Sequence, residues 1–62
     1  MGRYLLIIQR ADGHTDLVSG NDLGFLRQQA DANNMTEPVA LQIRIVEIYR
    51  LTDAWVEGVR TF

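Results

Sequence analysis

Residues 4–18 read YLLIIQRADGHTDLV, and this stretch decides the fold. The segment Tyr4–Gln9 is apolar on both faces of an extended strand, because successive side chains of a strand point to opposite sides. Asp12-Gly13 then separates it from a second strand-like segment, which is the strongest short-range signal for a β-hairpin. We therefore predict a strand over Tyr4–Gln9, a type I′ turn at Asp12-Gly13 and a return strand over residues 15–18.

Residues 19–22, Ser-Gly-Asn-Asp, predict a break followed by the start of a helix. Asn21 is a preferred N-cap residue, and Asp22 is favourable in a first helical turn. We expect the helix to run over about residues 22–33. At 3.6 residues per turn, one narrow stripe of it can pack on a sheet: Leu23, Leu26 and Ala30. Phe25 lies near the opposite side of this helix.

Residues 39–51 form the second long apolar stretch and allow two interpretations. As a helix, the stretch starts a heptad-like series that continues to Trp55 and Val59: Leu41, Ile45 and Ile48. As a strand, it alternates apolar with other side chains from Val39 to Ile45, and five of its members are β-branched, which favours the strand. The consecutive Ile45 and Val46 predict either a β-bulge or a second apolar patch made by Val46 and Ile48.

The end of the chain is less clearly patterned. Residues 51–54 are expected to turn the chain into a final segment over residues 55–61, either a strand or a last helical turn. The expected fold class is α+β, a small antiparallel sheet with one helix on one face in the order ββαβ(β), forming a single domain over residues 1–62. A chain of 62 residues buries only about 60% of its extended surface. With no cysteine for disulfides, self-association remains as a stabilising device.

One helix covers one face of such a sheet and leaves the other without cover. That second face carries either Leu5 and Ile7 or Leu6 and Ile8, and an apolar patch on a small domain usually marks an interface. The aromatic residues add side-chain types that are frequent at binding hot spots, although Trp55 can instead close the core. The candidate partner-binding residues are Leu6, Ile8, Val46, Ile48, Phe25, Tyr49 and Trp55.

The charge pattern disfavours nucleic acid as a partner. Eight acidic side chains face six basic ones, a net charge of −2, and every basic residue is arginine. Nucleic-acid binders normally carry the opposite excess. The alternative is a dimer that gathers arginines on a sheet face, with Arg44 and Arg50 on one side of the third strand and Arg10 at the end of the first.

Few residues could carry chemistry. The chain has no cysteine or lysine, one histidine and one serine, Ser19, without a histidine near it in sequence. Asp12, His14 and Asp16 alternate as metal ligands would on a strand, but a turn tip offers no burial or outer shell. Glycines surround the helix start, yet Asp22 opposes an anion there. We therefore expect no enzyme activity, cofactor, metal or small-molecule substrate.

The apolar segments are too short for a signal peptide or a membrane span, so we expect a cytoplasmic protein. These observations together favour a non-enzymatic interaction module that forms a homodimer or binds one protein partner. Such a module would act as a small bacterial or phage regulator that blocks its partner. A nucleic-acid-binding regulator is the alternative.

Overall fold

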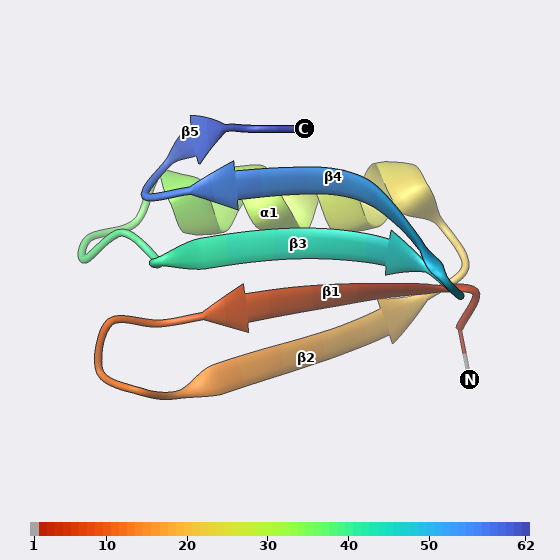
Figure 1. The fold of residues 1–62 in the computed structure, drawn as a ribbon, viewed down its shortest axis with the longest axis horizontal. Helices are drawn as coiled ribbons and strands as arrows, with labels where there is room; N and C mark the ends of the chain where they lie inside the picture. Colours follow the sequence, from red (N-terminus) through yellow and green to blue (C-terminus); the bar gives the residue numbers. More distant parts are fainter. Residues whose placement is uncertain (1) are drawn as a thin grey trace.

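A five-stranded antiparallel sheet has a single helix across one of its faces (Figure 1). The structure is a computed structural model that describes residues 2–62. Its elements in chain order are β1 (Tyr4–Gln9), β2 (Thr15–Gly20), α1 (Leu23–Asn34), β3 (Gln42–Glu47), β4 (Arg50–Val56) and β5 (Val59–Arg60). The sheet order is β2-β1-β3-β4-β5, so the α+β class is confirmed and the chain follows the order ββαβββ. No helix among the described residues is long and apolar enough to cross a membrane.

The first hairpin forms where it was predicted, but its turn differs. Gly13 has a φ of +96°, whereas Asp12 keeps a negative φ, so the type I′ prediction is wrong. The Gly13 N–H donates to the Arg10 carbonyl at 3.1 Å, and the Arg10 N–H donates to the His14 carbonyl at 2.8 Å. This is a longer loop closed by a left-handed glycine. Asp12 favours it because its carboxylate accepts the His14 N–H at 2.9 Å.

Helix α1 agrees with the predicted range, with its N-cap shifted by one residue. Asp22, not Asn21, is the N-cap, and its carboxylate accepts the Phe25 N–H at 3.2 Å. Asn21 instead accepts the Arg3 N–H at 2.9 Å, which joins the start of the chain to the start of the helix. The predicted stripe does face the sheet, since Leu26 and Ala30 are buried and Leu23 packs against them.

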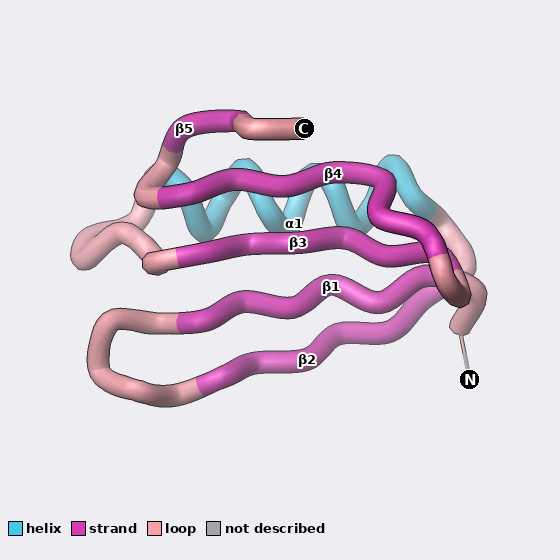
Figure 2. The backbone as a smooth tube through the Cα atoms, viewed as in Figure 1, coloured by secondary structure: helices cyan, strands magenta, loops and turns pink. Residues whose placement is uncertain are grey.

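Residues 39–51 contain a loop, the whole of β3 and the beginning of β4, so the strand interpretation is correct for β3 and the helix is excluded. The prediction of a turn over residues 51–54 is wrong, because these residues lie inside β4. The chain reverses earlier, at Ile48-Tyr49, and the two strands it joins are drawn side by side in Figure 2. Isoleucine and tyrosine are not turn residues, so the pattern carried no signal for this reversal.

The predicted bulge is present in the β3–β4 ladder. Ile45 pairs with Asp53 whereas Val46 pairs with Leu51, which leaves Thr52 as the extra residue. The Thr52 hydroxyl donates to the Ile45 carbonyl at 2.9 Å. The bulge lies in β4, and β3 keeps a regular alternation.

The final segment, left open by the sequence, ends β4 and then forms β5. Glu57 and Gly58 join the two strands with φ values of +49° and +85°. Two consecutive positive φ values are those of a type I′ turn.

The core lies between α1 and the sheet. Its buried members are Leu6, Ile8, Leu26, Ala30, Ala40, Ile43, Ile45 and Trp55. Leu6, Ile8 and Trp55 are therefore not surface residues, and their assignment to an exposed interface is corrected. The strand β1 is apolar on both sides, so the sequence could not decide which side α1 covers; the structure places Leu5 and Ile7 on the other one.

Candidate functional site

None of the helices and strands that the structure describes covers the face of the sheet opposite α1, and Figure 1 is viewed onto this face with α1 behind the strands. We call this surface the open face. Because register fixes which side chains share a face, they lie in three rows across the strands. The rows are Ser19-Leu5-Val46, Leu17-Ile7-Arg44-Ala54 and Thr15-Gln9-Gln42-Val56.

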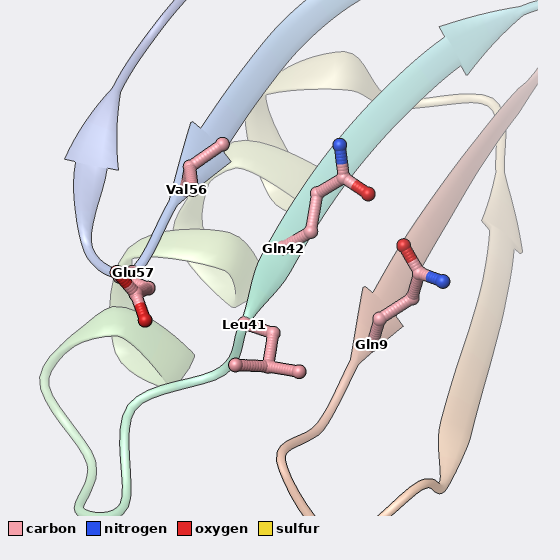
Figure 3. A pocket seen from close by; sticks show the side chains of 5 residues that line it. All are labelled: Gln9, Leu41, Gln42, Val56 and Glu57. Carbon is pink, nitrogen blue, oxygen red and sulfur yellow. The ribbon is translucent and has the colours of Figure 1, made fainter.

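The first two rows of the open face are apolar except for Ser19 and Arg44, the third is polar except for Val56, and the face is hollowed at both ends. Leu17 is 63% exposed, and Val56 is also exposed. One hollow of about 320 Å³ is lined by Leu5, Val46 and Ile48 together with residues near the N-terminus. The other, of about 390 Å³, lies at the opposite ends of the strands. Figure 3 shows its lining residues: Gln9, Leu41, Gln42, Val56 and Glu57.

Arg44 stands in the middle row of the open face, between Ile7 and Ala54. Its Nε is buried and has no hydrogen-bond partner among residues 2–62. Among the arginines of residues 2–62, it is also the one without a carboxylate partner. A buried N–H that lacks an acceptor costs about 1–3 kcal/mol. Arg44 is therefore the position on this face where an external acceptor would be most favourable.

The remaining predicted interface residues divide between two surfaces. Val46 and Ile48 meet at the same hollow of the open face, as the second-patch prediction required. Tyr49 is fully exposed at the tip of the same turn. Phe25 is exposed on α1, away from the open face. Neither Phe25 nor Tyr49 is therefore buried in the core of the described residues.

The structure does not gather the arginines of the nucleic-acid alternative. Arg10 binds Asp16 at 2.6 Å and Asn33 of α1 at 2.7 Å, so it lies on the helix side. Arg50 lies beside the hollow next to α1, because the reversal at Ile48-Tyr49 moves it into β4. Only Arg44 of the three lies on the open face, and the prediction that Arg44 and Arg50 share a face is wrong.

The helix side instead gathers a set of arginines that the sequence analysis did not find. We call the first set the Glu47 group: Arg3, Glu47 and Arg50. The Glu47 carboxylate accepts hydrogen bonds from Nε of Arg3 at 2.6 Å and from a terminal nitrogen of Arg50 at 3.1 Å. The bond from Arg3 lowers the pKa of Glu47 below its ordinary value, and the same bond raises the pKa of Arg3. No spacing in the sequence indicates this group, since Arg3 and Glu47 are far apart along the chain.

A second group surrounds Asp53, which is 0% exposed. Its carboxylate accepts Nε of Arg27 at 3.1 Å and a terminal nitrogen of Arg60. The Arg60 guanidinium also lies 5.0 Å from the centre of the Trp55 ring. We call these residues the Asp53 group: Arg27, Asp53 and Arg60.

The two aspartates considered as metal ligands are engaged in other contacts. Asp12 binds Nδ1 of His14 at 2.9 Å, and Asp16 binds Arg10. Within residues 2–62 there is no cluster of three or more His, Cys, Asp or Glu side chains suited to a metal ion. Glu47 and Glu57 lie at opposite ends of the β3–β4 pair and form no catalytic pair.

Comparison of the chain with protein-family models, with curated proteins and with solved structures finds no match in any of the three. The geometry of the open face and of the helix side is therefore what points to a function.

Proposed function

We propose that this chain is a self-associating interaction module in which two copies pack their open faces together. The observation that carries the proposal is Arg44, a charged side chain between Ile7 and Ala54 on the open face, whose buried Nε has no partner among residues 2–62. Such a face is expected to be covered, and the cover must supply an acceptor for Arg44.

A second copy supplies that acceptor. Glu57 lines the hollow at the end of the open face and forms no ion pair with any of residues 2–62. In a two-fold interface, each contact between different residues occurs twice. A two-fold axis that passes between Arg44 and Glu57 brings each Arg44 to the Glu57 of the other copy. The two sheets then pack face to face as in a sandwich, with the row Thr15-Gln9-Gln42-Val56 nearest the axis.

The size of the face sets the expected strength of this association. The molecule measures 28 × 20 × 19 Å, so its broad face offers roughly 500 Å² in projection, at the low end of what a specific interface buries on each partner. We therefore expect a dimer that dissociates on dilution, with a dissociation constant on the order of micromolar.

Light scattering on a sizing column, over a series of protein concentrations, tests the proposal. The mass should rise from 7.1 kDa towards twice that value. Leu17→Glu should weaken the dimer about tenfold or more, because it places a charge in the apolar contact. The matched control is Met35→Glu, which makes the same charge change at a residue 86% exposed outside the open face, and it should leave the dimer intact.

A charge swap tests the pairing itself. Glu57→Arg and Arg44→Glu should each weaken association, and the double variant should restore it, because the pair re-forms with exchanged charges. Glu57 is an exposed turn residue, so the Glu57→Arg variant should fold normally, and circular dichroism checks this. A protein that stays monomeric at millimolar concentration, or a double variant no better than either single one, contradicts the proposal.

A further inference from the structure

The helix side carries a hollow of about 480 Å³ between the Glu47 group and the Asp53 group. Arg50 and Glu47 line it from one group and Arg27 from the other. The two groups together hold four guanidinium and two carboxylate groups, a local side-chain charge of +2 in a chain whose net charge is −2. We call this hollow the arginine cleft.

The carboxylate oxygens of the cleft all accept hydrogen bonds from arginines, whereas the arginines keep unused N–H donors. Each oxygen of Glu47 and of Asp53 accepts from one arginine. A guanidinium has five N–H donors, and each of these arginines uses one nitrogen in its ion pair. Arg27 and Arg50 therefore keep free donors at the wall of the cleft, and the positive charge is not cancelled within the chain.

The walls of the cleft define the rest of the ligand. Leu23, Leu51 and two aromatic residues, Tyr4 and Phe62, line it beside the arginines. An anion with an apolar, ring-sized body fits such a wall, and the volume is within the range of small-molecule sites. Among common anions, a phosphate monoester carries close to two negative charges at neutral pH, which matches the local charge. A carboxylate or a sulfate ester carries one.

We propose that the arginine cleft binds the phosphate monoester of a small aromatic compound. Arg27 and Arg50 hold the phosphate through their free N–H groups, as guanidinium groups commonly do. Phe62 and Leu23 contact the ring. This site lies on the opposite side of the sheet from the open face, so binding does not depend on self-association.

Isothermal titration with phenyl phosphate tests the site, with inorganic phosphate and phenyl sulfate as comparison ligands. Phenyl phosphate should bind about tenfold more tightly than either, because only it combines the second charge with the ring. Equal binding of all three, or no binding of phenyl phosphate at about 10 mM, overturns the proposal. Tighter binding of a short single-stranded oligonucleotide than of phenyl phosphate also overturns it, in favour of a nucleic-acid surface.

Matched variants locate the site. Arg50→Gln should weaken the binding of phenyl phosphate about tenfold. It should leave the fold intact, because Arg50 is exposed and Glu47 keeps its ion pair with Arg3. Phe62→Ala should weaken phenyl phosphate and leave inorganic phosphate unchanged. The control is Arg10→Gln, which removes the same charge at an ion pair outside the cleft. If Arg10→Gln weakens binding as much as Arg50→Gln, the attraction is non-specific and the proposed site is wrong.

Discussion

The tip of the β1–β2 hairpin contains two residues, Asp12 and His14, that shift each other's pKa. The hydrogen bond between the His14 ring and the Asp12 carboxylate raises the pKa of His14. The pKa of Asp12 is lowered, mainly by the hydrogen bond from the His14 backbone N–H and next by the bond from the His14 ring. A raised histidine pKa stabilises the fold below about pH 6.5, and this contribution is lost as pH rises through the folded value. A lowered aspartate pKa stabilises the fold above about pH 4, and that contribution is lost in acid.

Asp12→Asn should return the pKa of His14 towards its ordinary value. Asparagine can still accept the His14 N–H, so the variant removes the charge and keeps the loop. His14 is the single histidine, which makes its ring protons a clean NMR probe of the titration. The control is Asp31→Asn on α1, which should leave the pKa of His14 unchanged. An equal pKa in the wild type and in Asp12→Asn would show that the pair does not form in solution.

Ile48 adopts a backbone conformation that β-branched residues rarely tolerate. Its φ is +55°, at the reversal between β3 and β4, and its side chain is 69% exposed. Ile48→Asn should raise the free energy of unfolding by about 1 kcal/mol, because asparagine accepts the left-handed region more readily and little burial is lost. Urea unfolding at low protein concentration measures the change.

Tyr49→Asn is the matched control for this prediction. Tyr49 lies in the same turn, is fully exposed and does not have a positive φ, so its replacement should change stability little. A lower urea midpoint for Ile48→Asn would indicate that Ile48 makes contacts that outweigh the strain.

At the scale of elements, Asp53 joins the end of the chain to the helix. From β4 its carboxylate binds Arg27 of α1 and Arg60 of β5. The Thr61 N–H adds a bond of 2.9 Å to the Ala54 carbonyl. A two-residue strand such as β5 forms few backbone hydrogen bonds to its neighbour, so these contacts hold it in place.

Asp53→Asn should lower the free energy of unfolding by about 1–3 kcal/mol. The change removes two charge-assisted contacts and keeps the side-chain volume, and the estimate allows for the half-exposed arginines. Trp55, the single tryptophan, reports both the urea transition and any release of Arg60 from its ring. The same change at exposed Asp31 is the control, and an equal loss there would show that Asp53 has no special role.

The elements differ in how far the sequence predicted them. The first hairpin and α1 were predictable, because Asp12-Gly13 and the helical stripe act through neighbours in the chain. The reversal between β3 and β4 was not predictable, since neither Ile48 nor Tyr49 is a typical turn residue. The pairing of the two strands imposes this reversal. The Glu57-Gly58 turn was predictable in principle, because Gly58 is a turn residue between two apolar segments.

At the scale of the whole molecule, one helix and one sheet produce two different surfaces. The open face carries apolar rows and the unpaired Arg44, whereas the helix side carries the arginine cleft. A chain of 62 residues has one layer of core, so the sheet residues that do not face α1 have no second layer packed on them among residues 2–62. Self-association and ligand binding can therefore use opposite sides without competition.

The sequence by itself determined the α+β class, the first hairpin, the helix with its core stripe and the candidates Val46 and Ile48 for the open face. These follow from residue periodicity and turn chemistry, which act over a few residues. Only the tertiary structure decided that Leu6 and Ile8 face α1, and which arginines converge. The physical reason is that β1 is apolar on both sides, so its orientation depends on the helix it packs against. Likewise, the Glu47 and Asp53 groups join residues distant in the chain. Strand pairing brings Arg3 to Glu47, and the packing of α1 on the sheet brings Arg27 to Asp53.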